Sequence, residues 1–255
     1  MNRDERADAA SERSVDLTPP EPAPPASGVL GAALGEAARK AGFDPETNAT
    51  TGGVVWRAMG GFRGIVEAVL PGLVFIVVFT LTTDPETREA NLWLSLGLSV
   101  GVAAVFTLLR LIQRGPASAA FGGLVATAAA AGLALWTGRG QDNFIPGLIT
   151  NAAYGTAFLV SALIGWSLIG LAAGFLMNEG IAWRSDKRKR RVYFWLAIAW
   201  AALFYLRLAV QLPLYFADEV AALGTLKLIM GLPLFAPLAA VTWLAVRALY
   251  KQRAE

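Results

Sequence analysis

Six apolar stretches follow one another between residues 62 and 249, separated by short polar segments. They predict membrane spans at about 62–82, 92–112, 117–136, 144–164, 192–216 and 222–247. Each stretch has roughly the 20 apolar residues that a hydrocarbon core of about 30 Å requires. Because a helix pairs its own backbone groups in lipid, the pattern predicts an all-α polytopic transmembrane helix bundle of about six spans.

A further apolar stretch, residues 165–177, is too short to cross a bilayer. It lies between the fourth and fifth predicted spans, next to a run of basic residues. We therefore expect a short interfacial or re-entrant helix at this point.

The basic residues between the spans fall almost wholly on one side of the predicted bundle. Thirteen lie on that side: Arg57, Arg63, Arg110, Arg114, Arg184, Lys187, Arg188, Lys189, Arg190, Arg191, Arg247, Lys251 and Arg253. The other side has three: Arg88, Arg139 and Lys227. Since Lys and Arg in short loops resist translocation, the pattern predicts that both termini are cytoplasmic.

The first 55 residues differ in composition from the rest of the chain. Residues 1–50 carry five Lys and Arg against nine Asp and Glu, and residues 1–28 are rich in Pro and Ala. Such a segment buries too little apolar surface to offset its ordering entropy, so we expect a disordered cytoplasmic tail at 1–55. A short helix over 28–42 is compatible with its pattern, either as a solvated helix or as one that binds a partner or touches the membrane. Residues 56–255 form the predicted membrane domain.

Composition limits the chemistry that the chain can perform. The 255 residues are 55% hydrophobic and 16% charged, and they include no Cys and no His. The absence of both excludes thiol nucleophiles, imidazole proton relays and ordinary zinc sites. We expect no metal and no cofactor. The sequence pI of about 9.4 follows from the one-sided basic residues, so no nucleic-acid partner is expected.

Arg207 is the most unusual residue, because it lies deep in the fifth predicted span. An Arg near the middle of a span costs about 2.5–3.5 kcal/mol on insertion scales, so it should face the bundle interior or water. Gln211 lies one turn away, and Asn151 and Tyr154 of the fourth span reach a similar depth. We predict a polar intramembrane cluster of these four residues. It acts either as a structural tie between two helices or as an anion or lipid-headgroup site.

Glu67 is a second ionisable residue inside a predicted span. It lies one turn from Arg63 and at the same level as Arg110, near the cytoplasmic face. The three residues form either an ion-pair cluster or, through Glu67, a proton or cation site. Pro71 removes the helical hydrogen bond to the carbonyl of Glu67, as in helices that line transporter sites.

Six basic residues precede the fifth span and form a candidate contact with anionic lipid headgroups. They are Arg184, Lys187, Arg188, Lys189, Arg190 and Arg191. Each Lys or Arg near an anionic leaflet is worth about 1 kcal/mol, so we expect membrane lipids to be partners of this segment.

Several motifs resemble one known protein family. They are residues 63–75, 144–147 with Asn151 and Tyr154, 178–180 with Trp183 and Arg184, 206–207 with 210–215, and 231–234. Together they resemble a family of integral membrane proteins of high-GC bacteria known only as a domain of unknown function. A looser resemblance links the proline-bearing first span and the Trp183-Arg184 pair to the intracellular septation protein A family. The resemblance implies a bacterial plasma-membrane location and, from the second family, a role in the cell envelope.

From these patterns we predict a multi-pass protein of the bacterial plasma membrane that is not an enzyme. Its expected role is envelope-associated and exerted through lipid or membrane-protein partners. The alternative is a small transporter or channel with polar sites near Arg207 and Glu67. The sequence shows neither paired carboxylates nor a nucleophile triad, the patterns that would favour catalysis.

Overall fold

A computed structural model describes residues 61–113, except Arg88, and 117–251. The predicted tail, with its expected helix over 28–42, lies outside the described residues. The described chain contains α4 (Gly61–Thr82), α5 (Leu92–Ile112), α6 (Ala117–Thr137), η1 (Gly140–Phe144), α7 (Ile145–Leu163), α8 (Leu168–Leu176), η2 (Ala182–Ser185), α9 (Lys187–Phe216), α10 (Val220–Ile229) and α11 (Leu232–Lys251). The predicted all-α fold is confirmed in this part of the chain.

Five helical segments are long and apolar enough to cross a membrane. They are Gly61–Thr82, Leu92–Ile112, Gly140–Leu163, Lys187–Phe216 and Val220–Tyr250. The remaining predicted span corresponds to α6, in which Phe121–Thr137 forms a shorter apolar helix. The expected short helix is α8, which begins after Ser167, whose side chain accepts a hydrogen bond from the backbone N–H of Gly170.

Two predicted spans differ from the structure in a way that local sequence explains. The helix predicted over 192–216 begins earlier, at Lys187, because the carboxylate of Asp186 accepts the backbone N–H groups of Arg188 and Lys189. The helix predicted over 222–247 is divided into α10 and α11. The break falls at Gly231, two residues before Pro233. A proline fits a straight helix only in the first turn, so a new helix, α11, begins just before Pro233.

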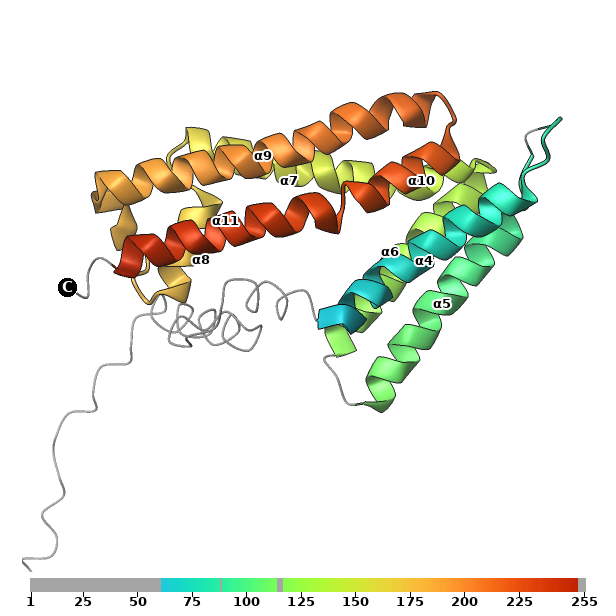
Figure 1. Ribbon diagram of the computed structural model, residues 1–255, viewed down its shortest axis with the longest axis horizontal. Coiled ribbons are helices and arrows are strands. Elements are labelled where there is room, and N and C mark those ends of the chain that lie inside the picture. The colour runs from blue at the N-terminus through green and yellow to red at the C-terminus, as the bar shows by residue number, and fades with distance from the viewer. Residues whose placement is uncertain (1–60, 88, 114–116, 252–255) are drawn as a thin grey trace, which may run out of the picture.

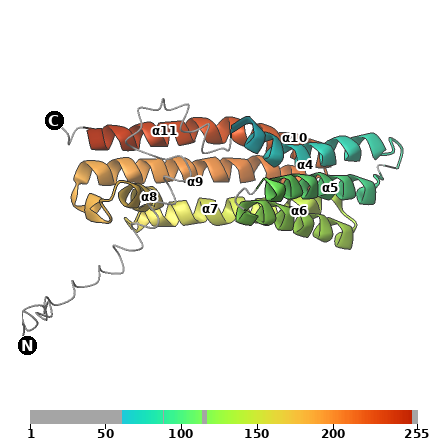
Figure 2. The ribbon, with the colours of Figure 1, turned by 90° about the horizontal axis from the view of Figure 1, so that it is seen from below.

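The helices form two arms (Figure 1). One arm contains α4, α5 and α6, and the other contains α7, α9 and α11, with α8 at its far end. The arms meet around η1 and α10 and diverge toward the ends where α4 and α9 begin. The view from below shows α7, α9 and α11 extending along the long axis of the molecule (Figure 2).

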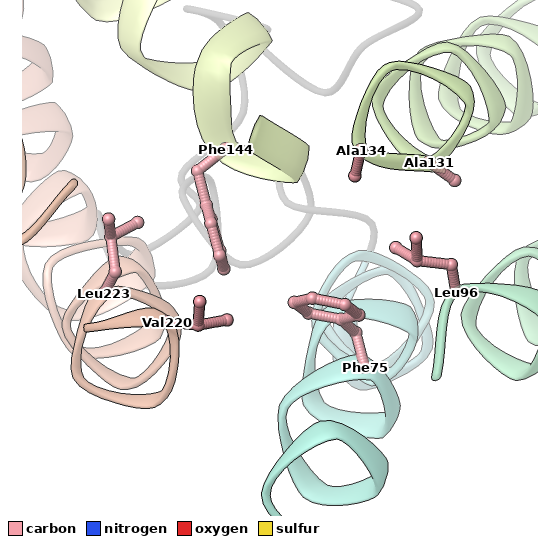
Figure 3. Packing of buried hydrophobic residues seen from close by; sticks show 7 residues of the cluster. All are labelled: Phe75, Leu96, Ala131, Ala134, Phe144, Val220 and Leu223. Atoms are coloured by element: carbon pink, nitrogen blue, oxygen red, sulfur yellow. The ribbon is translucent and has the colours of Figure 1, made fainter. Parts of the chain in front are cut away.

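An apolar cluster joins the two arms where they meet. It contains Phe75 of α4, Leu96 of α5, Ala131 and Ala134 of α6, Phe144 of η1, and Val220 and Leu223 of α10 (Figure 3). Phe75 lies with its ring centroid 5.8 Å from that of Phe144, in an edge-to-face arrangement. Residues from five elements therefore share one core, and α10 is fixed against α4.

Polar contacts close the same end of the molecule. The hydroxyl of Tyr215 donates a hydrogen bond of 2.7 Å to the buried carboxylate of Asp142. Arg139 forms an ion pair of 3.1 Å with Asp218, and Gln141 donates a hydrogen bond to the same carboxylate. The segment between α6 and α7 is thus tied to the turn between α9 and α10.

Candidate functional site

A cavity of about 550 Å³ lies inside the arm of α4, α5 and α6 and extends to α10 and the start of α7. We call it the central cavity. Its charged and amide-bearing lining residues are Glu67, Arg110, Asn143 and Lys227. Along α4, Glu67 and Pro71 line the cavity while Phe75, one turn further on, belongs to the apolar cluster. The cluster therefore lies between the cavity and the end of α4 at Thr82.

The carboxylate of Glu67 is held by two arginines at one end of the central cavity. Glu67 Oε1 lies 2.7 Å from Arg63 Nε, and Glu67 Oε2 lies 3.2 Å from Arg110 Nη2. Arg63 also donates a hydrogen bond to the side chain of Gln113. The structure thus brings together the three residues that the sequence grouped near one face of the membrane.

Pro71 shapes the wall of the central cavity. It lacks an N–H, so the carbonyl of Glu67 loses its helical donor. The hydroxyl of Ser99 on α5 donates a hydrogen bond of 2.8 Å to the carbonyl of Pro71 itself. This contact between buried groups fixes α4 against α5 at the level of the cavity.

Lys227 lines the central cavity from α10, a different helix from those that carry Arg63 and Arg110. It belongs to α10, seven residues after Val220, and it is half-buried rather than part of an outer loop. Its Nζ lies 5.0 Å from the centroid of the Phe144 ring, within the range of a cation–π contact. Within the described residues, no carboxylate forms an ion pair with Lys227.

The sequence counts Lys227 among the basic residues of the outer side, and the structure places it inside α10, two turns after Val220. Its position inside the predicted span 222–247 was the signal that could have revealed it. Sequence reasoning missed Lys227 as a site residue because the residue was used only as one of the charges that predict the sidedness.

The four residues of the predicted cluster around Arg207 lie on the contact between α7 and α9. Asn151 and Gln211 are buried, whereas Tyr154 is exposed and stacks on Phe204 with ring centroids 5.6 Å apart. In the described chain, Arg207 Nε and Gln211 Nε2 are buried without a hydrogen-bond partner. Arg207 is close enough to Lys227 for the two cations to repel each other.

The six basic residues before the fifth predicted span do not share one environment. Lys189 is 2% exposed, and its Nζ lies 2.6 Å from Glu179 Oε2 and 3.9 Å from the centroid of the Tyr250 ring. The guanidinium carbon of Arg184 lies 3.9 Å from the centroid of the Trp166 ring. The predicted lipid contact is thus wrong for Lys189, because its charge is buried and paired; the exposed members are Lys187, Arg188, Arg190 and Arg191.

The charges around the central cavity favour an anionic ligand. The lining contains one carboxylate, that of Glu67, and two cations, Arg110 and Lys227. Arg63 also forms an ion pair with the Glu67 carboxylate. A cation inside a membrane protein is normally paired or faces water, because desolvating it is costly. No group of three or more acidic side chains that could hold a metal ion occurs within the part of the chain that the structure describes.

The apolar helices, the broken helix α10–α11 and the cavity between helices define a multi-pass helical membrane protein. The chain belongs to a family described as protein of unknown function (DUF3159), whose model matches residues 59–253. No curated protein and no solved structure matches the chain.

Proposed function

We propose that this protein is a small transporter or channel for an anionic solute, acting without covalent chemistry. The observation that carries the proposal is Lys227, a cation that lines a cavity among membrane helices without a carboxylate partner in the described chain. A bound anion would supply the missing charge. At about 550 Å³, the cavity is within the size range of small-molecule sites, about 300–1,000 Å³.

Two features of the helices support transport rather than permanent binding. The α10–α11 helix is interrupted beside Lys227, and α4 carries Pro71 one turn from Glu67. Interrupted helices near the middle of the membrane are the usual place of substrate sites in transporters. The ion pair between Glu67 and Arg110 gives the cavity a contact that an incoming anion can compete for.

A second candidate function is that of an envelope-associated protein that acts through lipid or protein partners. The exposed basic residues at the start of α9 favour it, because such residues attract anionic headgroups. In both proposals the protein lies in the bacterial plasma membrane with its termini in the cytoplasm, and nucleic acid is not a partner. The resemblance to the septation protein family is consistent with this second role.

Anion-dependent currents in proteoliposomes test the first proposal. The full chain is reconstituted and exposed to gradients of chloride, inorganic phosphate and lactate. We expect at least one anion to give a current in the parent, and we expect Lys227→Gln to abolish it. Arg247→Gln is the matched control, since it removes one exposed cation that does not line the central cavity. The proposal would be contradicted if the parent gave no current with any of the three anions, or if Lys227→Gln gave the same currents as the parent.

A further inference from the structure

A second cavity, of about 510 Å³, lies where α9 begins, and we call it the α9 cavity. It is enclosed by the end of α7, the segment before α8 and the first two turns of α9. Three of its lining residues are basic and the rest are mostly apolar or aromatic. The residues on α9 are Lys187, Arg190, Arg191, Phe194 and Trp195.

The three basic residues of the α9 cavity present free positive charge. Arg190 lies three residues after Lys187, and Arg191 lies four residues after it. The three side chains therefore share one face of α9. All three are exposed, and within the described residues none forms an ion pair. They differ in this respect from Lys189, whose charge is neutralised by Glu179.

Exposed apolar side chains also line the α9 cavity, beside the three basic residues. Leu163, which lines it, is 68% exposed, and Trp195 is 63% exposed. Ile164, next to Leu163 at the end of α7, is exposed as well. Aromatic side chains of this kind gather at the level of lipid headgroups, and exposed aliphatic side chains next to them contact acyl chains. The cations and the apolar surface therefore match the two parts of a phospholipid.

Among the described residues, the one hydroxyl group that lines this cavity, that of Ser167, contributes little to ligand recognition. Ser167 lines it, but its hydroxyl already donates a hydrogen bond of 2.8 Å to the carbonyl of Tyr193. Trp183 also lines the cavity, and its indole Nε1 is buried without a partner in the described chain. The selection expected at this site is for the negative charge of a phosphate group, and not for a particular sugar or polyol.

We propose that the α9 cavity binds the headgroup of an anionic phospholipid, with the phosphate among Lys187, Arg190 and Arg191 and the acyl chains against Leu163 and Trp195. The site is separate from the central cavity and does not depend on transport. It turns a general attraction between basic residues and the membrane into one defined lipid position.

Native mass spectrometry of the full chain, released from nanodiscs, tests this site. The parent is compared in phosphatidylglycerol and in phosphatidylcholine, and the dissociation constant of the first bound phosphatidylglycerol is measured. The double variant Arg190→Gln/Arg191→Gln should raise that dissociation constant about thirtyfold. Each basic residue near an anionic lipid is worth about 1 kcal/mol, so the two together are worth about 2 kcal/mol. The control, Arg188→Gln/Arg247→Gln, removes the same charge from exposed residues outside the cavity, and it should stay close to the parent.

Three results would overturn the site. Equal losses in the two double variants would mean that only net charge matters. Equal retention of phosphatidylcholine and phosphatidylglycerol by the parent would remove the phosphate charge from recognition. Displacement of the lipid by inorganic phosphate at matched concentration would identify a free-anion site instead. Melting temperatures of both variants are measured in parallel, so that a loss of bound lipid is distinguished from a loss of folded protein.

Discussion

Lys189 Nζ lies 2.6 Å from Glu179 Oε2, and both side chains are almost fully enclosed, at 2% and 8% exposure. The hydroxyl of Tyr250 donates a hydrogen bond to the same carboxylate oxygen. The pair therefore joins the start of α9, the segment after α8 and the end of α11. One basic residue of a run that looks uniform in sequence is thus a structural residue.

Replacing Lys189 by Gln should destabilise the protein. Removing one member of a buried ion pair leaves the other charge without compensation and costs about 3–5 kcal/mol. We expect a clear fall in the detergent melting temperature for Lys189→Gln. Arg191→Gln, which removes an exposed cation two residues away, should leave it unchanged. Similar melting temperatures for the two variants would show that the pair contributes no net stability.

The close approach of α10 to α4 gives a second prediction. A Cβ atom added to Gly224 would overlap the side chain of Ile76, whose Cδ1 would lie 2.6 Å away. Overpacking of this kind costs about 1–3 kcal/mol, so Gly224→Ala should lower the melting temperature. In Gly97→Ala the new Cβ meets nothing within 4 Å. That control should be neutral or slightly stabilising, since Ala favours a helix over Gly by up to about 1 kcal/mol. A Gly224→Ala protein as stable as the control would contradict this packing.

The sidedness of the bundle stays a prediction, and reporter fusions test it. Fusions after Asp84, Asn143 and Asp218 should report the outer side, and fusions after Gly115, Asp186 and Arg253 the cytoplasm. The reason is the excess of basic residues near the second group of positions. The fusion after Asn143 is decisive, because a cytoplasmic signal there means that α6 does not cross the membrane.

The turn between α4 and α5 gives a pH-dependent prediction. The backbone N–H groups of Thr87 and Glu86 donate hydrogen bonds to Asp84, and they lower the pKa of its carboxyl. A lowered pKa means that the contribution to folding is present above the unfolded value of about 3.9 and is lost as pH falls through the folded value. The carboxyl carbon shift of Asp84, followed by NMR, should titrate at lower pH than in a peptide of residues 82–89. Identical midpoints would show that these hydrogen bonds are absent in solution.

The spans could be predicted closely from sequence, whereas the site could be predicted only in part. The bounds of α4, α5 and α7 agree with the predicted spans to within one residue, because a bilayer sets the length of an apolar run. Glu67 and Arg110 were grouped by their depth in the membrane alone. For two adjacent antiparallel helices, equal depth is sufficient to predict that two side chains lie close together. Lys189 required tertiary information, because its partner lies across a loop. Lys227 did not, because it lies inside a predicted span, but it was counted only among the charges that predict the sidedness.

Arg207 separates the structural and the ligand-binding interpretations of the cluster on α7 and α9. A structural tie requires the guanidinium to be satisfied by its neighbours. Within the described residues, however, Arg207 has no ion pair, its Nε has no hydrogen bond, and a second cation, Lys227, is nearby. The side chain therefore adds unfavourable charge to the folded protein unless water or an anion compensates it.

We therefore expect Arg207→Gln to melt at the parental temperature or above, and to lose the anion-dependent current or the anion-induced rise in melting temperature. Removing the charge relieves an insertion cost of about 2.5–3.5 kcal/mol and leaves a shorter, neutral amide. Arg207→Lys is the control: it keeps the charge but not the planar fork, and it should retain part of the response. A lower melting temperature in Arg207→Gln with an unchanged anion response would instead establish the structural tie, because the loss would then fall on packing between α7 and α9 alone.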